Sequence, residues 1–435
     1  MGRTLIQNAT IFDATGAKSY RGDLLVEANR IAAVAASGTR DLARELGGDD
    51  QVIDAGGRFL MPGMTEGHAH LSFENVCATE DLIRPTPEEQ VFTAARGAKA
   101  LIEAGFTSAY GASEAKLRLA VAVRNEVNAG RIPGPRIRAG GLELSVTGAM
   151  GDEAREHNVR PGPATIVDGI EEMRKAVRLH CREGVDNIKL DVSGDPFYPS
   201  TPSTSTPMTF EEVKAAADTA HAYGRKINAH TRSIEGSKYC VRAGVDGLFH
   251  CEYSDEDLLD LMEEAKDRIF VVPTVGLFHQ IMKGEASGHG LSPEVGGYMN
   301  IPELLENSVK THSELRRRGI RHLIGGDYGF GWSPQGTQGR DLEFFIEYYG
   351  YSPEEALICA TRNGGLAMGY GGELGTLEVG KLADLILVNG DPIADITVLS
   401  GPQKVDLVIK DGTIQKLSPA LGVRAASAAA LEPAE

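Results

Sequence analysis

The chain has 435 residues, of which 42% are hydrophobic and 24% are charged, and its formal net charge is −17 at pH 7. This length is too great for one small core and suits one large domain with a smaller companion. The acidic balance argues against nucleic acid or an anionic membrane as the main partner. No apolar stretch is long enough to span a bilayer, so we expect the partner to be a small-molecule substrate.

The cysteine pattern indicates a reducing environment. The five cysteines are scattered, odd in number and without a Cys-x-x-Cys pair. Such usage is typical of structural thiols in the cytoplasm. The first residues show neither a secretory signal nor the Ser or Thr of a myristoylation site, and we therefore expect a cytoplasmic protein.

Both ends of the chain predict β-structure. Short apolar runs separated by Gly, Asn and Asp occupy the first sixty residues, and similar runs return at 383–388 and 405–409, followed by a hairpin turn at 410–413. We expect residues 1–62 and 369–418 to pair into one small β-sandwich. Residues 419–435 are rich in Ala and Ser and lack a periodic apolar face, so we expect them to be poorly ordered.

The long middle alternates strands and helices. A strand carrying a histidine pair is followed by apolar runs at 107–110, 136–140, 187–191, 226–230, 247–250, 269–273 and 322–326. Amphipathic helices are predicted between them, for example at 88–104, 170–182, 210–223, 302–318 and 353–367. Eight strand–helix units predict an α/β fold: a (β/α)8 TIM barrel over residues 63–368, inserted in the β-sandwich, with its active site at the carboxyl ends of the strands.

Potential metal ligands close these strands. His68 and His70 are two residues apart, so on a strand both imidazoles face the same side. His230, His250 and Asp327 each end a later apolar run. Taken singly, either of the later histidines could be a hydrogen-bonded core residue and Asp327 could cap a turn. Their shared position at strand ends favours a metal centre.

Lys189 is the anomaly among these residues. It lies in the apolar run Ile188-Lys189-Leu190, where a buried unpaired ammonium is very costly. A salt bridge, deprotonation or carboxylation by CO2 would relieve that cost. Carboxylation gives an anionic carbamate with two oxygens, and the neighbouring imidazole and carboxylate ligands favour this outcome. Such ligands suit Zn2+, with Mn2+, Co2+ and Fe2+ as alternatives.

The ordered set of motifs resembles the amidohydrolase superfamily, in its branch of imidazolonepropionase-like proteins and Xaa-Pro dipeptidases (prolidases). The matching segments, which span nearly the whole chain, are 67–70, 186–190, 228–230, 249–250, 326–327 and 380–385. The resemblance implies two divalent metal ions bridged by an N6-carboxylated Lys189. One ion would be held by His68, His70 and Asp327, and the other by His230 and His250.

The implied reaction is hydrolysis of a C–N bond in an amide, peptide, carbamate or urea by a metal-activated hydroxide. Asp327 would act as general base and then as general acid. A metal-dependent deaminase is the nearest alternative, but such sites typically carry a glutamate three residues after His230, where this chain has Ser233. A catalytically inactive scaffold of the same fold is the other alternative, and it would be expected to have lost ligands.

Residues just after the strand ends should line the pocket. The candidates for substrate binding are Arg232, Tyr253, His279, Tyr328, Phe330 and Trp332. The guanidinium of Arg232 would hold a substrate carboxylate or carbonyl, or else pair with an acid such as Glu235. An aromatic loop at 328–332 suggests either an apolar pocket wall or a packed loop.

Two departures from the branch make the pocket more apolar. Residues 147–152 lack the histidine that follows the third strand in that branch, and Tyr328 follows Asp327 where a serine is usual. Phenylurea- and molinate-hydrolase-type substrates are therefore as compatible as a dipeptide or an N-acyl amino acid. The architecture also commonly forms homo-oligomers.

Overall fold

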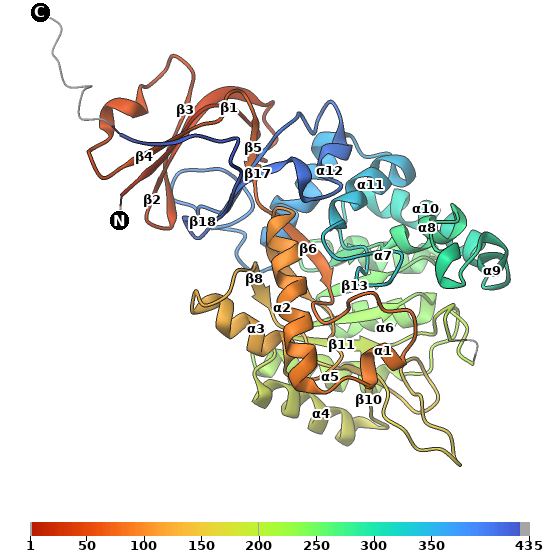
Figure 1. Cartoon of the computed structure of the whole chain (residues 1–435). Helices are drawn as coiled ribbons and strands as arrows, with labels where there is room; N and C mark the ends of the chain where they lie inside the picture. Colours follow the sequence, from red (N-terminus) through yellow and green to blue (C-terminus); the bar gives the residue numbers. More distant parts are fainter. Residues whose placement is uncertain (1, 199, 427–435) are drawn as a thin grey trace, which may run out of the picture.

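The computed structural model describes residues 2–198 and 200–426. Strands from the two ends of the chain, red and blue in Figure 1, lie together on one side of the molecule, and the barrel with its helices lies beyond them. The mixed α/β class with a separate sheet from both ends, as expected from the sequence, is confirmed.

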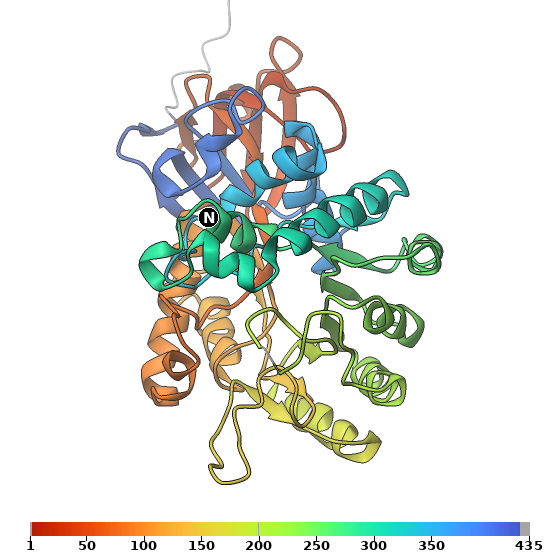
Figure 2. The same ribbon diagram turned by 90° about the vertical axis from the view of Figure 1, so that its right-hand side faces the viewer.

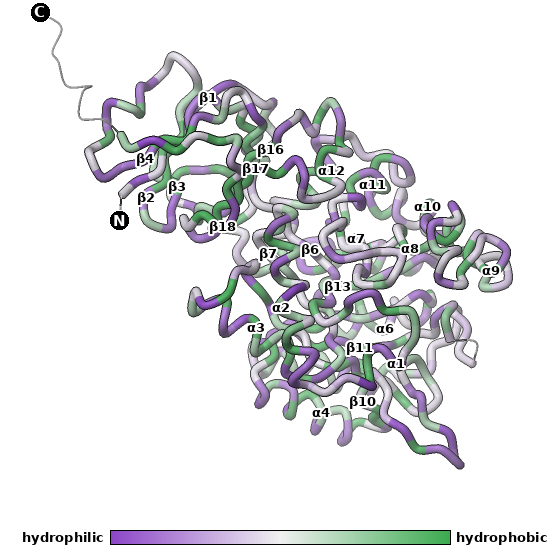
Figure 3. Tube along the Cα trace, in the orientation of Figure 1, coloured by the Kyte–Doolittle hydropathy of each residue, from purple (hydrophilic) through white to green (hydrophobic). Residues whose placement is uncertain are grey.

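The terminal sheet has nine strands within the described residues, in the order β18-β17-β16-β5-β1-β2-β3, with β4 pairing β1 and β19. Its strands are β1 (Thr4–Ile11), β2 (Tyr20–Glu27), β3 (Arg30–Ala36), β4 (Gln51–Asp54), β5 (Phe59–Pro62), β16 (Leu385–Val388), β17 (Val405–Lys410), β18 (Thr413–Leu417) and β19 (Val423–Ala425). Antiparallel β5–β16 pairing joins the two ends of the chain. The buried face is apolar and includes Ile6, Leu60 and Leu385, and β16 and β17 are largely hydrophobic in Figure 3.

Three local features of this sheet bear on the predictions. Two of the short apolar runs near the start of the chain, residues 4–6 and the run that begins at Thr10, belong to one strand, β1, whose register shifts between Ile6 and Ala9, where Asn8 adopts a φ of 59°. The predicted hairpin turn is confirmed, with positive φ at Asp411 and Gly412. The expectation of a poorly ordered tail from residue 419 is wrong for Val423–Ala425, because their backbone pairs with β4; residues 427–435 of that prediction lie outside the described residues.

Parallel strands form the barrel. They are β6 (Met64–Ala69), β7 (Phe106–Gly111), β8 (Arg136–Arg138), β9 (Glu143–Ser145), β11 (Asn187–Asp191), β12 (Lys226–Thr231), β13 (Gly247–His250), β14 (Phe270–Val272) and β15 (Arg321–His322), with β10 (Ala164–Ile166) beside β9. The ladders fall into sheets of three and seven strands. Backbone hydrogen bonds from Asp186 to Ala139, at 2.7 Å, and from Gly67 to Ile324, at 2.9 Å, link the two sheets at both seams.

The seam between the first and last barrel strands needs glycine. A Cβ at Gly67 would meet the carbonyl oxygen of Ile324 at 2.5 Å, and one at Gly325 would meet the backbone nitrogen of His68 at 2.7 Å. This close approach also explains why β15 covers two residues instead of the expected 322–326. The chain beyond it bends toward the barrel mouth and carries Asp327 there.

Helices cover the outside of the barrel, and in Figure 2 those coloured yellow to green stack in a row along one side. They are α1 (Glu80–Ile83), α2 (Pro87–Glu103), α3 (Leu119–Asn128), α4 (Ile170–Glu183), α5 (Phe210–Ala222), α6 (Ile234–Ala243), α7 (Glu256–Glu264), α8 (Val275–Met282), α9 (Pro293–Tyr298), α10 (Ile301–Arg317), α11 (Asp341–Tyr349), α12 (Pro353–Ala360) and α13 (Arg362–Ala367). Within the described residues, no helix is both long and apolar enough to cross a membrane.

The helix expected at 353–367 is two helices. Thr361 leaves helical geometry with φ −115° and ψ −81°, and its hydroxyl donates to the carbonyl of Leu357 at 2.6 Å. The break redirects α13 so that Gly364 approaches Thr65 on β6, where a Cβ would meet the threonine side chain at 2.4 Å. Two of the other expected helices, α2 and α5, begin at capping boxes formed by Thr86 and Thr209.

Candidate metal centre and cavity

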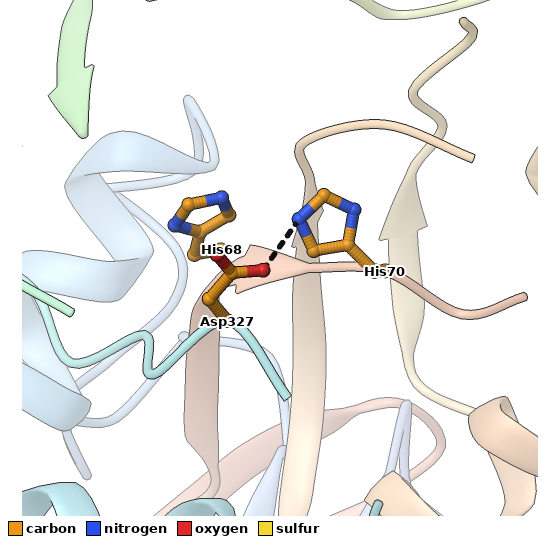
Figure 4. Close-up of side chains that lie close together, drawn as sticks. All are labelled: His68, His70 and Asp327. Carbon is orange, nitrogen blue, oxygen red and sulfur yellow. Dashed lines mark ion pairs between the residues drawn. The ribbon is translucent and has the colours of Figure 1, made fainter. Parts of the chain in front are cut away.

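The histidine pair of β6 meets Asp327 at the barrel mouth. His70 Nε2 lies 3.0 Å from Asp327 Oδ1, as Figure 4 shows. Ligand atoms of His68, His70 and Asp327 all lie within 4.8 Å of one another, a spacing that could hold a metal ion. Burial raises the pKa of Asp327, but the two imidazoles outweigh it, so the pKa falls below its ordinary value and the carboxylate stays ionised.

The other two histidines join this cluster. His230 ends the inner face of β12 and His250 ends β13, and their ring centroids lie 4.5 Å apart. The rings of His68 and His250 are 5.4 Å apart. All four imidazoles are buried, so the structure brings together the five histidine and aspartate ligands that the sequence predicts.

Neighbouring groups fix the orientation of these rings. His70 Nδ1 donates to the carbonyl of Ser113 at 2.8 Å. His250 Nδ1 donates to the hydroxyl oxygen of Thr274, which itself donates to the carbonyl of Pro273 at 2.8 Å. At His250 this arrangement leaves the Nε2 lone pair of the ring available to a cation, whereas Nε2 of His70 faces Asp327 Oδ1.

The remaining two rings are also in a form that binds metal. His230 Nε2 donates to the carbonyl of Gly194 at 3.1 Å, and this leaves Nδ1 free. His68 Nδ1 is buried without a hydrogen-bond partner among the described residues. Burial lowers the pKa of His68 and His250, and lowers that of His230 to about 3. Neutral imidazoles with free lone pairs, beside an ionised carboxylate, fit a divalent metal such as zinc.

Lys189 lies in the middle of β11, where it is 2% exposed. Within the described chain, its nearest carboxylate oxygen is Glu143 Oε1, at 3.7 Å. That separation is longer than a charge-assisted hydrogen bond. The ammonium also lies 4.8 Å from the centre of the Phe249 ring. Lys189 therefore reaches the histidine cluster without a close anionic partner.

A cavity of about 660 Å³ opens over these residues. All six predicted metal ligands line it, and so do three of the predicted substrate-binding residues: Arg232, Phe330 and Trp332. The structure places the other three elsewhere. Tyr328 donates to Asp341 at 3.0 Å, Tyr253 donates to Glu303 at 3.1 Å, and His279 on α8 pairs with a tyrosine hydroxyl of α11 at 2.7 Å.

Arg232 is held by two acids, neither of which is Glu235. Its Nε donates to Asp195 Oδ2 at 3.0 Å, and its Nη1 pairs with Glu252 Oε1. The guanidinium also lies over the ring of Phe278, 5.0 Å from its centre. The salt-bridge alternative for Arg232 therefore holds with different partners, while the side chain still borders the cavity.

Sequence reasoning missed several acidic residues at this site. Glu143 and Asp195 line the cavity, as does Asp152 from the loop after β9. Asp191 lies two residues after Lys189 on β11 and is fully buried. Strand alternation would have placed Asp191 on the same face as Lys189, but the acids on the neighbouring elements carried no comparable signal.

Comparison with known proteins identifies the family. A model of the amidohydrolase family matches residues 59–414. The ochratoxinase of Aspergillus niger is 30% identical over 387 residues, covering 83% of this chain and 76% of the relative. The imidazolonepropionase of Symbiobacterium thermophilum is 26% identical over 415 residues, covering 90% and 89%. A solved Xaa-Pro dipeptidase with bound methionine has a TM-score of 0.81 at 26% identity, covering 95% of this chain and 99% of that one.

The match spans most of the chain and agrees with a barrel whose strand ends gather four imidazoles and a carboxylate. The resemblance inferred from the motifs is thereby confirmed. The chain belongs to the amidohydrolase family and is a metal-dependent hydrolase of C–N bonds.

Proposed function

We propose that the cavity holds two divalent metal ions bridged by a carboxylated Lys189. The assignment gives one ion to His68, His70 and Asp327 and the other to His230 and His250. The observation that carries the proposal is the buried ammonium of Lys189, which borders the imidazole cluster with no carboxylate closer than 3.7 Å within the described chain. Loss of a proton from the ammonium lets Nζ add CO2, and loss of a second proton leaves a carbamate, whose two oxygens share one negative charge and could each contact a cation.

Zinc is the metal that these ligands favour. Neutral imidazoles and a carboxylate are ordinary zinc ligands, and Mn2+, Co2+ and Fe2+ accept the same set. The partners of the Nδ1 atoms of His70 and His250 support the assignment, because such second contacts orient a ligating ring and fix its tautomer.

The reaction is hydrolysis of a neutral carbonyl compound with a nitrogen leaving group. When bound, the metal ions supply Lewis-acid polarisation of the scissile carbonyl and activation of the attacking water. Asp327 accepts the proton of that water on its carboxylate and then donates it to the leaving nitrogen. Its lowered pKa keeps it ionised at neutral pH.

The substrate is an amide, peptide, carbamate or urea with an apolar portion. The rings of Phe330 and Trp332 stack with centroids 5.2 Å apart at the cavity wall, which supports an apolar group beside the scissile bond. Two relatives, ochratoxinase and a Xaa-Pro dipeptidase, support an amide or peptide bond. The five free cysteines support action in the cytoplasm.

The test is a substrate screen with the purified, zinc-loaded enzyme. N-acyl amino acids, Xaa-Pro dipeptides, carbamates and aryl ureas are compared, and at least one class should be hydrolysed. Release of ammonia from an amino-substituted ring instead would favour a deaminase, and turnover of none of these compounds would favour a scaffold.

Lys189→Ala tests the carbamate. The variant should lose most activity and recover part of it with acetate or propionate, whose carboxylate can occupy the place of the carbamate. Lys238→Ala is the matched control. Lys238 lies on α6 and is also buried, but its ammonium pairs with Asp255 at 2.7 Å. It should keep its activity and show no response to carboxylates. Unchanged turnover in Lys189→Ala would contradict the proposal.

A further inference from the structure

The turn after β13 has an unusual backbone conformation. His250, the last residue of the strand, has a φ of 74°, and Cys251 follows with a φ of 54°. Residues other than glycine rarely adopt this left-handed region, and they remain there only where the surrounding structure holds them. The φ of His250 also sets the direction of its Cα–Cβ bond. The contacts that hold this turn therefore decide where the imidazole of a proposed metal ligand points.

Two consecutive side chains of α10 hold the turn from outside the barrel. His312 Nε2 donates to the carbonyl of His250 at 2.6 Å. Thr311 donates from its hydroxyl to the carbonyl of Glu252 at 2.7 Å. No other side chain of the described residues donates to the carbonyl of His250. Since that carbonyl belongs to the peptide group between the two left-handed residues, the contact with His312 fixes the strained part of the turn.

The ring of His312 is itself held in place. The side chain is 0% exposed. Its Nδ1 lies 3.1 Å from Nε2 of His322 on β15, and its ring centroid lies 5.3 Å from that of Tyr349 on α11. A buried ring enclosed by two neighbouring elements has little freedom to follow a moving carbonyl. His312 is therefore a rigid anchor for the turn.

This anchor acts on one part of the histidine cluster. The ring of His250 has a separate anchor, because its Nδ1 donates to Thr274, so Thr274 fixes the rotation of the ring and His312 fixes the backbone. The ligands proposed for the other ion, which are His68, His70 and Asp327, make no hydrogen bond to α10 in the part of the chain that the structure describes. A change at His312 should therefore reach one ion and spare the other.

We propose that His312 is a positioning residue for the metal ion shared by His230 and His250. It holds the carbonyl of His250, and this keeps the turn in its left-handed form and the imidazole directed at the ion. The inference rests on the proposed function, because it assigns a residue to the metal centre proposed there. Loss of a group that orients a metal ligand typically weakens metal binding by about tenfold to a hundredfold, and we expect a selective loss of this size.

Graded removal of zinc from the loaded enzyme by a chromophoric chelator tests the proposal. The wild type should release two ions per chain. His312→Leu removes the donor and keeps an apolar side chain in the space, so it should hold one ion as the wild type does and the other about tenfold or more weakly. His312→Met is the second donor-free variant if the first does not fold. His312→Gln places an amide N–H near the position of Nε2 and should hold both ions as the wild type does.

His180→Leu is the matched control. His180 is also a buried histidine on a helix, α4, and neither of its ring nitrogens has a hydrogen-bond partner among the described residues. The substitution removes the same chemical group from the core without touching the turn after β13. It should release both ions as the wild type does. A general loosening of the fold would weaken both ions, so selective weakening of one ion distinguishes positioning from a merely structural role.

Three results would overturn the role of His312 and leave the proposed function standing: two ions held normally in the donor-free variants, equal weakening of both ions, or equal weakening in His312→Gln and His312→Leu. Release of fewer than two ions by the wild type is a different result. It would remove the proposed pair of metal ions, and with it the ion that His312 positions.

Discussion

Replacing Arg232 by methionine should strongly destabilise the protein. The guanidinium is 2% exposed and its partners, Asp195 and Glu252, are 6% and 0% exposed. Methionine keeps contact with the Phe278 ring but leaves two buried carboxylates without their cation. Removing one partner of such a buried pair costs about 3–5 kcal/mol, so we expect Arg232→Met to lower the free energy of unfolding by about that amount.

The assay is urea unfolding followed by far-ultraviolet circular dichroism. Adding Glu252→Gln to Arg232→Met removes one of the two uncompensated charges and should recover about half of the loss. Arg44→Met is the control, because the Arg44 side chain is 80% exposed and its pair with Asp41 lies at the surface. Arg44→Met should change the free energy of unfolding by less than about 1 kcal/mol. A loss below about 1 kcal/mol in Arg232→Met, or no recovery in the double variant, would refute the reasoning.

Three further predictions concern catalysis, pH and thiol access. Asp327→Asn should lower kcat by about a hundredfold or more in steady-state assays, since it removes the proposed proton acceptor; a loss below about threefold would remove that role. Burial raises the pKa of Asp384 to about 6, above its value in the unfolded chain, so stability should fall as the pH rises from about 4 through about 6. Asp384→Asn should reduce this dependence of the free energy of unfolding on pH, measured by urea unfolding at several pH values. Equal pH dependence in the variant and the wild type would contradict the prediction. Of the five free cysteines, Cys77 is exposed at the cavity rim and the other four are buried. Mass spectrometry of the native protein after maleimide treatment should therefore find one adduct, at Cys77. Additional adducts on the folded protein would contradict the burial of the other four cysteines.

The gathering of the proposed metal ligands around one cavity could be predicted because their signals are local. His68 and His70 share a strand face, and Lys189, His230 and His250 lie on or at the ends of short apolar runs, so barrel topology alone brings them together. The parallel strands of the barrel and the joined chain ends followed from the same strand patterns, but β9 and β10 were not predicted.

Residues after the strand ends were harder to predict because the backbone turns there. Asp327, Cys251 and Thr274 adopt φ values of 58°, 54° and 54°. These left-handed positions break the alternation that assigns side chains to faces. Tyr328 and Tyr253, which follow two of these turns, consequently point to partners outside the cavity.

Partners distant in the sequence could not be predicted either. The acids that hold Arg232 are 37 and 20 residues away from it, and no periodic pattern links such positions. Asp191 carries a strand signal, yet its lack of donors becomes visible only once the elements around it are placed.

Anomalous diffraction from crystals of the zinc-loaded enzyme, grown with bicarbonate, tests the central claim most directly. The account predicts two zinc peaks, one among His68, His70 and Asp327 and one between His230 and His250. Continuous density from the side chain of Lys189 should reach both peaks. A single peak, with an unmodified Lys189 directed at Glu143, would contradict it.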